Sequence, residues 1–171
     1  MPSTREGDAT ADALRRLLIR DLEAVRRELR AFPDEGLIWA HPPGAPNSAG
    51  TLALHLCGNL QHFVGAQLGA TGYVRDRDAE FSDRDVPLAE LERRIDQTQA
   101  AVEVTLALGV IDLDAEYPLE VAGVRLSTRT FLLHLTSHLA YHLGQIDYHR
   151  RLVTGSSDGV GAVAIPDLAA P

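Results

Sequence analysis

The segment from residue 48 to residue 68 restricts the fold more than any other part of the chain. It contains no Asp, Glu, Lys or Arg, and apolar side chains dominate it. Asn47 or Ser48 can cap a helix here, because short polar side chains accept hydrogen bonds from the first free amides of a helix. A helix without a charged face has to be covered on most sides. We therefore expect the rest of the chain to surround this segment.

Three further segments have helical periodicity and can provide this cover. The first spans residues 10–31 and places a stripe of apolar residues on one face, namely Leu14, Leu18, Leu22, Val25 and Leu29. The other two span residues 87–108, with Pro87 in the first turn and Gly109 at the end, and 127–153, with Gly155 just beyond. No segment alternates strongly enough to predict a sheet. The sequence therefore predicts an all-α fold, most simply a four-helix bundle.

The segments between the predicted helices indicate how these are connected. The link 69–86 is long and charged, which suits a crossover joining two parallel helices, because a short loop would force antiparallel neighbours. The link 111–126 is extended in character, and its Ala122-Gly123 pair can form the turn of a short hairpin. The tail 155–171 is rich in Gly, Ala, Ser and Pro. We expect it to be irregular, either lying on the surface or contributing to a subunit contact.

Length and composition limit the class of protein. With 171 residues, 45% hydrophobic and 23% charged, the chain has the size and balance of one globular domain spanning residues 1–171. No apolar run approaches the roughly 20 residues of a membrane span. The polar N-terminal stretch lacks the apolar core of a secretory signal, so we expect a cytoplasmic protein without a membrane partner. The formal charge of −8 disfavours nucleic-acid binding, and the single cysteine, Cys57, excludes an internal disulfide.

Histidines recur every fourth residue in HLTSHLAYHLGQ, as His134, His138 and His142. On a helix, histidines four apart can bind one ion, whereas those eight apart are separated by about 12 Å. The ligand pair is therefore His134 with His138, or His138 with His142. A third ligand has to come from another helix, and either His55 or His62 can provide it, since these two lie about 10 Å apart. Three histidines with an open fourth position are typical of a catalytic metal site, and imidazole suits zinc, nickel, copper or iron.

Two other interpretations of the histidines stay open. In a metal-free bundle they would be ordinary hydrogen-bonded residues of the core or surface, and replacing them by alanine would have only the effect of a core truncation. In a non-catalytic bundle they would bind a metal or another ligand without supporting a reaction. An open coordination position facing solvent distinguishes an enzyme from such a binding module.

Three motifs together resemble the DinB/YfiT-like metalloenzyme superfamily. SHLAYHLGQI resembles the signature of its fourth helix, and NSAGTLALHLCGNL resembles that of its second helix. RDRDAEF is similar to a charged string in one uncharacterised bacterial branch. The resemblance covers residues 10–153, which is nearly the whole predicted domain.

This resemblance implies a fold, a metal site and a class of activity. It implies an up-down-down-up helix order, with His55, His138 and His142 as ligands of nickel or zinc. Such proteins are often dimers, and characterised relatives include thiol transferases and a thiol-dependent isomerase that use small intracellular thiols. Further candidates, which can line the pocket or orient the ligands, are Asn59, His62, His134, Tyr141 and Gln145. No residue is assigned a catalytic role.

The residues near the predicted site favour thiol chemistry. A metal held by three neutral imidazoles keeps its full charge and can activate a water or a thiol. Leu139 follows His138, so the HExxH motif that supplies a metalloprotease with its base is missing. We therefore expect transfer of a small thiol to a small electrophile. Arg75 and Arg77 can bind an anionic substrate, but we favour pairing of the charges within RDRDAEF, which would fix the crossover.

Overall fold

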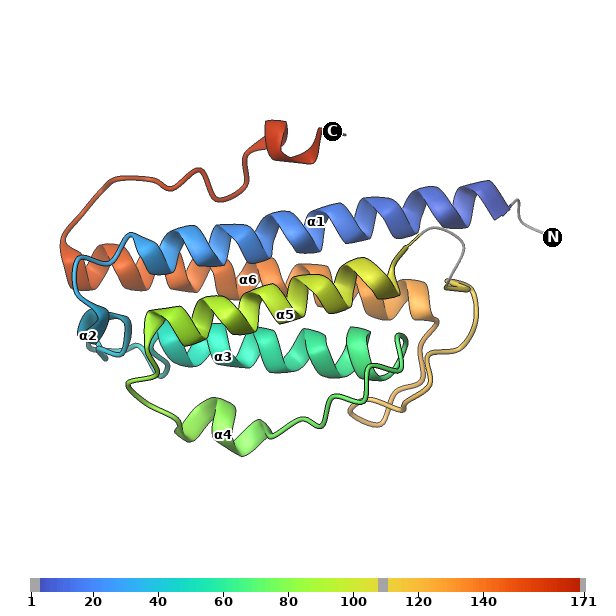
Figure 1. Ribbon diagram of the computed structural model, residues 1–171, viewed down its shortest axis with the longest axis horizontal. Coiled ribbons are helices and arrows are strands. Elements are labelled where there is room, and N and C mark those ends of the chain that lie inside the picture. The colour runs from blue at the N-terminus through green and yellow to red at the C-terminus, as the bar shows by residue number, and fades with distance from the viewer. Residues whose placement is uncertain (1–3, 108–110, 170–171) are drawn as a thin grey trace.

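The computed structural model of the chain describes residues 4–107 and 111–169, with side chains from residue 9 onwards (Figure 1). Within these residues four long helices form the body of the molecule: α1 (Thr4–Arg30), α3 (Ala49–Leu60), α5 (Leu88–Thr105) and α6 (Thr128–Thr154). Shorter elements lie between and after them: α2 (Glu35–Ile38), the π-helical turn η1 (Gln61–Ala66), α4 (Arg77–Ser82) and the 3-10 turn η2 (Ile165–Leu168). This described part of the chain has two isolated β-bridges and no strand, which confirms the predicted all-α class.

The long helices pack side by side, so that α1 and α3 each contact both α5 and α6. In Figure 1, α3 and α5 run in one direction, and α1 and α6 run in the opposite direction. Because α3 and α5 are parallel, the chain has to return along the molecule between them. The returning segment, residues 67–87, carries α4 along the outside of α3 and is called the crossover below (Figure 1).

Every residue of α3 is buried, as the absence of charge predicted. The helix begins after Ser48, whose hydroxyl accepts a hydrogen bond from the Thr51 amide at 3.1 Å. Although α3 is apolar, neither it nor any other helix in the described residues is long and apolar enough to cross a membrane.

The end of this segment differs from the prediction of a continuous α-helix to residue 68. Residues Gln61–Ala66 form the π-helical turn η1 instead, in which the Gln67 amide donates to the His62 carbonyl at 3.1 Å. This shift leaves the Phe63 carbonyl to accept a 2.7 Å hydrogen bond from the Tyr117 hydroxyl. The long link before α6 is thereby tied to the end of α3.

The other predicted helices differ from the structure mainly at their ends. α1 begins earlier than expected, at Thr4, and α6 ends before Gly155, which has the predicted positive φ, at 70°. α5 ends at Thr105, earlier than the predicted end near residue 108; Leu108 and Gly109 themselves lie outside the described residues. The short elements α2, α4 and η2 were not predicted, because four to six residues are too few to show helical periodicity.

The link before α6 contains the expected Ala122-Gly123 turn. Both residues have a positive φ, 52° for Ala122 and 77° for Gly123. Two isolated pairs bridge across the turn, Val121 with Val124 and Glu116 with Ser127, and neither extends into a strand in the described part of this link.

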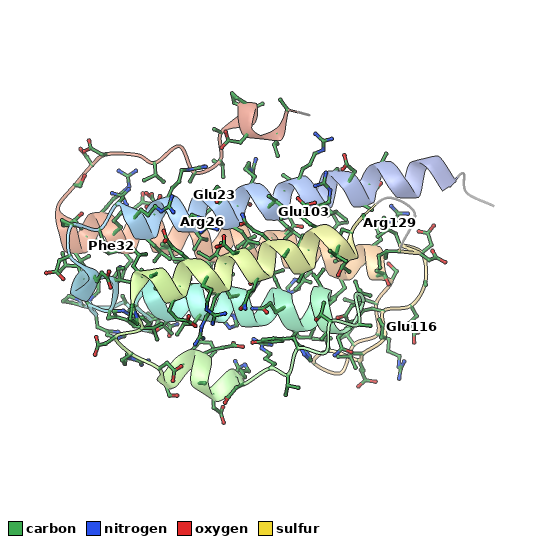
Figure 2. All side chains as sticks on the ribbon, viewed as in Figure 1. Glu23, Arg26, Phe32, Glu103, Glu116 and Arg129 are labelled. Carbon is green, nitrogen blue, oxygen red and sulfur yellow. The ribbon has the colours of Figure 1, made fainter. Side chains whose placement is uncertain are left out.

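Ion pairs fix α1 against its two neighbours. Arg26 on α1 pairs with Glu23 one turn earlier, at 2.9 Å, and with Asp96 on α5, at 2.5 Å (Figure 2). Arg150 on α6 pairs with Glu28 on α1 at 2.5 Å, and both side chains are almost completely buried. The position of α6, which carries the candidate ligands, is therefore set by α1 as well as by α3.

The described part of the C-terminal tail, residues 155–169, is irregular apart from η2 and lies along α1 (Figure 1). Arg27 on α1 donates hydrogen bonds to the Val160 carbonyl at 3.1 Å and to the Gly161 carbonyl at 3.0 Å. The described part of the tail therefore lies on the surface of its own chain, and a contribution to a subunit contact stays a prediction.

Candidate metal centre

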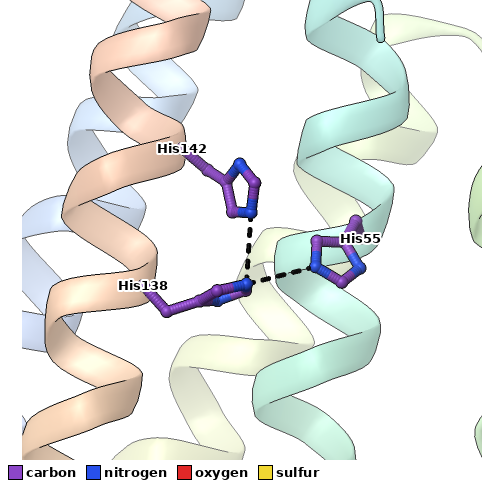
Figure 3. A group of neighbouring side chains, drawn as sticks. All are labelled: His55, His138 and His142. Atoms are coloured by element: carbon purple, nitrogen blue, oxygen red, sulfur yellow. Dashed lines mark hydrogen bonds between the residues drawn. The ribbon is translucent and has the colours of Figure 1, made fainter. Parts of the chain in front are cut away.

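Three of the candidate histidines lie together between α3 and α6 (Figure 3). His55 projects from α3, and His138 and His142 project from successive turns of α6. The His138 Nε2 atom lies 3.4 Å from His55 Nε2 and 3.1 Å from His142 Nε2. Ligands held tetrahedrally at about 2.0–2.1 Å from one ion are themselves roughly 3.3 Å apart. These nitrogens therefore have the separation that a shared metal ion requires.

The structure separates the alternatives that the spacing left open. His138 and His142 lie on the face of α6 that packs against α3, so this is the pair that meets His55. His134 is exposed one turn earlier, with its ring centroid 6.1 Å from that of His138. His62 is half-buried on η1. Neither His134 nor His62 belongs to the group of three.

The Glu80 carboxylate, from the crossover, binds Nδ1 of His55, the ring nitrogen that faces away from the other two histidines and is called the outer nitrogen below. His55 Nδ1 donates to Glu80 Oε2 at 3.0 Å, because an ionised carboxylate can only accept. Arg75 donates from Nε to Glu80 Oε1 at 2.6 Å and from Nη2 to Oε2 at 2.8 Å. Burial alone would raise the pKa of Glu80, but the hydrogen bonds from Arg75 and His55 outweigh it and bring this pKa below its ordinary value. With its proton on Nδ1, His55 presents the Nε2 lone pair to the other two histidines.

Gln145 holds the outer nitrogen of His142 in the same way. His142 Nδ1 donates to Gln145 Oε1 at 2.6 Å, so the Nε2 lone pair of His142 is directed at His138. His138 has no such outer partner among the described residues, since its Nδ1 atom is buried and unpaired. This nitrogen is the one polar atom of the cluster whose requirement is not met by the protein.

The meeting of three Nε2 atoms is unfavourable unless a positive charge lies between them. Lone pairs from His55 and His142 both face His138, which can donate a proton to only one of them. A divalent cation accepts all three lone pairs at once. The residues present therefore fit a divalent transition-metal ion.

Burial keeps the α6 imidazoles in the neutral form that metals require. Burial, reinforced by the neighbouring His142 and His55, lowers the pKa of His138 to about 4. Burial also lowers the pKa of His142, and its side-chain hydrogen bond opposes this only in part. Both rings are therefore neutral at neutral pH, which is the form in which an imidazole can bind a metal.

The remaining candidates surround the cluster and differ in exposure. Tyr141 is 65% exposed, and its ring centroid lies 5.2 Å from that of His142. His134 and Gln145 are exposed on the same flank of α6, so solvent reaches the cluster from this side. Asn59 lies one turn beyond the histidine of α3 and is buried, and its Oδ1 atom has no partner within the described part of the chain.

Sequence reasoning did not find the contribution of α4. Glu80 and Phe81 both face His55, and the Phe81 ring centroid lies 4.9 Å from that of His55. Gly58 makes this approach possible, because a Cβ atom there would lie 2.1 Å from Glu80 Oε1. The available signal was the RDRDAEF string. Its charges do pair with one another, as Arg75 and Glu80 show, but the pair also reaches a histidine.

A cavity of about 180 Å³ lies next to the cluster and has Glu80 in its wall. Its lining includes Cys57, Tyr73 and Arg94 but none of the three histidines, so it gives no access to their Nε2 atoms. Burial raises the pKa of Cys57 to about 11. Cys57 is therefore a packed thiol and not an activated nucleophile.

Comparison with protein families agrees with this geometry. The sequence model of the family described as mycothiol-S-transferase matches residues 13–155, which include the three histidines and the whole crossover. The chain belongs to the mycothiol-S-transferase family. This family is part of the DinB/YfiT-like superfamily, which confirms the resemblance drawn from the three motifs. Comparison with curated proteins gave no significant match, and neither did comparison with solved structures.

Membership of the mycothiol-S-transferase family indicates a thiol-related transferase, and the three adjacent histidines could hold a metal ion. The match leaves out the first turns of α1 and nearly all of the C-terminal tail. What this chain shares with the mycothiol-S-transferase family is therefore the set of long helices and the crossover, which are the elements that build the site.

Proposed function

We propose that this chain is a metal-dependent transferase that joins a low-molecular-weight thiol, such as mycothiol, to a small electrophile. His55, His138 and His142 hold a divalent ion in this proposal, either nickel or zinc. The observation that carries it is the convergence of the three Nε2 atoms in a member of the mycothiol-S-transferase family.

The reaction forms a carbon–sulfur bond. The thiol sulfur bonds to the electrophilic carbon, the leaving group departs with the bonding electron pair, and the thiol proton passes to solvent or to the leaving group. A bound divalent ion would supply positive charge that favours the thiolate over the thiol. Glu80 and Gln145 hold protons on the outer nitrogens of two imidazoles, which keeps their Nε2 lone pairs free. In this proposal Tyr141, which is exposed on α6, donates a hydrogen bond to the electrophile.

The distribution of carboxylates favours thiol transfer over hydrolysis. A hydrolase of the metalloprotease type needs a carboxylate beside the metal as general base. α6 carries no Asp or Glu between Arg129 and Asp147. Glu80 is engaged by Arg75 and by the outer nitrogen of His55, so it is not free to accept a proton from water at the Nε2 side.

Arg77 is the cationic group that can meet an anionic part of the substrate. Its guanidinium lies over the Phe81 ring, 5.0 Å from the centroid, and Phe81 in turn packs on His55. Arg75 is already bound to Glu80 through two hydrogen bonds. Arg77 has no ion-pair partner among the described side chains and can bind a carboxylate with its own two donors.

We further propose that residues 1–171 form one cytoplasmic domain with an up-down-down-up helix order, which acts as a homodimer. The helix contacts and the chain directions in Figure 1 support the helix order. Exposed apolar side chains on α6, which a second copy could cover, support the dimer: Leu133, Tyr148 and Leu152.

A thiol-transfer assay with metal-loaded protein tests this function. Protein loaded with zinc or nickel is mixed with mycothiol and a fluorogenic bimane electrophile, and adduct formation is followed over time. The loaded wild type should react faster than metal-free protein and faster than His138→Ala, whereas His41→Ala, at an exposed position before α3, should equal the wild type. A loaded wild type that reacts no faster than His138→Ala would exclude the function.

A further inference from the structure

We infer that Arg75 and Glu80 are positioning residues that fix His55 for metal binding, so that occupation of the metal site and docking of α4 on the bundle reinforce each other. This inference deepens the proposed function and rests on its metal site. Both residues lie in the crossover, outside the two helices that carry the histidines.

The hydrogen bonds form a chain that ends at the metal-facing side of one ring. Arg75 fixes the Glu80 carboxylate through both of its oxygens, at 2.6 and 2.8 Å. Glu80 Oε2 then accepts a hydrogen bond of 3.0 Å from Nδ1 of His55, which leaves the other ring nitrogen, Nε2, free to face the metal site. Arg75 is itself held, because its guanidinium lies 5.5 Å from the centroid of the Phe63 ring. A carboxylate in this position fixes the tautomer and the orientation of a metal-binding imidazole and increases the basicity of the ligand nitrogen.

An ion pair that only fastened the crossover would not need a buried carboxylate or two side chains in contact with His55. If Arg75 and Glu80 served only to fasten the crossover, the carboxylate could stop at the surface of α3. Instead the Glu80 side chain is buried, with 4% of its surface exposed, and packs against α3 at Gly58, where no side chain is in the way. The next residue, Phe81, packs on the same imidazole with ring centroids 4.9 Å apart. Two consecutive side chains of α4 are thus directed at His55.

The same contact makes the coupling mutual. Withdrawal of electron density from His55 Nε2 by a metal makes Nδ1–H a better donor, which strengthens the hydrogen bond to Glu80. If Glu80 favours metal binding, metal binding must favour the docked position of Glu80 to the same extent. The backbone of α4, which spans Arg77–Ser82, should therefore open less often when the site is filled.

The first experiment compares zinc affinities by competition with a chromophoric chelator. Glu80→Gln removes the charge and should weaken zinc binding about 10- to 100-fold. Glu90→Gln is the matched control, because Glu90 is also bound by arginines, Arg93 and Arg94, and contacts none of the three histidines. Glu90→Gln should bind zinc as the wild type does. Folded Glu80→Gln protein that binds zinc within about twofold of the wild type overturns the inference.

Glu80→Asp is a second variant that tests the same role if Glu80→Gln fails to fold. It keeps the charge and the partner Arg75 but shortens the side chain by one methylene group, which withdraws the carboxylate from His55. It should also bind zinc more weakly than the wild type. Wild-type affinity in folded Glu80→Asp would show that only the charge of the crossover matters and would contradict the positioning role.

Hydrogen exchange provides the readout of coupling. Zinc should slow amide exchange in residues 77–82 of the wild type and of Glu90→Gln, and should have a smaller effect in Glu80→Gln. Equal protection of this segment in Glu80→Gln and the wild type, at saturating zinc, would refute the coupling.

Failure of the proposed function has a different outcome. A wild type that binds neither zinc nor nickel would remove the metal-dependent transferase. The positioning role is then read from the nitrogen-15 spectrum of the histidine rings in the metal-free protein. A proton on Nδ1 of His55 in the wild type supports the role of Glu80, and a proton on Nε2 instead overturns it.

Discussion

Gly58 on α3 and Glu80 on α4 approach so closely that a Cβ atom at position 58 would lie 2.1 Å from Glu80 Oε1 and 2.7 Å from its Cδ. The absence of a side chain at Gly58 therefore allows the buried Glu80 carboxylate to lie against α3 and bind His55. Glu80 cannot move aside freely, because Arg75 and His55 hold both of its oxygens.

Gly58→Ala should displace the Glu80 carboxylate and weaken zinc binding in the same direction as Glu80→Gln, by about 10-fold or more. Gly144→Ala on α6 is the matched control. A Cβ at Gly144 meets nothing within 4 Å, and alanine is the better helix former by roughly 0.5–1 kcal/mol. Gly144→Ala should therefore bind zinc normally and unfold at slightly higher urea concentration. Equal zinc affinity in both alanine variants would contradict the steric argument.

His138→Ala should abolish binding of the metal, since His138 Nε2 contacts both other nitrogens of the cluster. We expect about one equivalent of metal in the wild type, and an affinity in the variant lower by more than about 100-fold, beyond the effect of losing an outer partner. Elemental mass spectrometry and chelator competition measure the two quantities. His134→Ala, one turn away, should keep its metal. Loss of metal in His134→Ala but not in His138→Ala would reverse the choice of ligand pair.

Arg150→Ala should reduce the free energy of unfolding by about 3–5 kcal/mol, because it leaves the carboxylate of Glu28 buried without its cation. The double variant Glu28→Leu/Arg150→Met should lose much less, since it removes both charges and retains apolar volume. Urea unfolding of the metal-free protein measures both. Arg93→Ala, which breaks an exposed pair, should leave the urea midpoint almost unchanged. A loss in Arg150→Ala no larger than in Arg93→Ala would refute the prediction.

Tyr117→Phe should cost about 1 kcal/mol, because it removes the hydrogen bond to the Phe63 carbonyl that η1 leaves free. The tyrosine is 2% exposed, so water does not replace the lost donor. Tyr148→Phe, at a position 70% exposed, should stay within about 0.5 kcal/mol of the wild type. The difference between the two urea midpoints tests the claim, and equal midpoints would argue against it.

The metal-free protein should lose stability as the pH falls from 7.5 to 5, in part through His149. Burial lowers the pKa of His149, its hydrogen bond to the Ala40 carbonyl opposes this only in part, and nearby His41 lowers the pKa further. In the unfolded chain a histidine titrates near its ordinary pKa of about 6.5. The unfolded state therefore binds the proton first, so the contribution of neutral His149 is complete above pH 6.5 and declines below it.

His149→Phe should flatten this dependence, whereas His134→Gln, at an exposed position, should leave it unchanged. Urea midpoints at half-unit pH steps provide the comparison. Some slope should remain in His149→Phe, because burial also lowers the pKa of His138 and His142. A slope identical to that of the wild type would exclude His149 as a contributor.

Burial of α3 could be predicted because its cause lies in the sequence itself, where no charged residue interrupts the segment. The ligand pair could not be chosen by spacing alone. His134, His138 and His142 follow the same i, i+4 rule, and only the packing of α6 against α3 decides which two face His55. The resemblance of SHLAYHLGQI to the family signature pointed to His138 and His142, because the residues of that signature are the ones that face the site in the folded protein.

The role of Glu80 could not be predicted from periodicity or motif spacing. It lies 25 residues from His55 and belongs to α4, a helix of only six residues. Nothing local in the sequence shows that the crossover folds back so that its one buried carboxylate meets an imidazole. The π-helical turn η1 escaped prediction for a related reason, since its extra hydrogen-bond acceptor is used by Tyr117, which is distant in sequence.

Two of the three candidate ligands share one helix, whereas the third lies on a neighbouring helix. The offset between His138 and His142 is fixed by the pitch of α6, whereas the position of His55 depends on how far α3 slides along α6. Ions of different radius would therefore be accommodated by a small translation of α3, with the crossover drawn along through Glu80. Exchange of one metal for another should therefore change the position of α3 along α6 and leave the internal geometry of α6 unchanged.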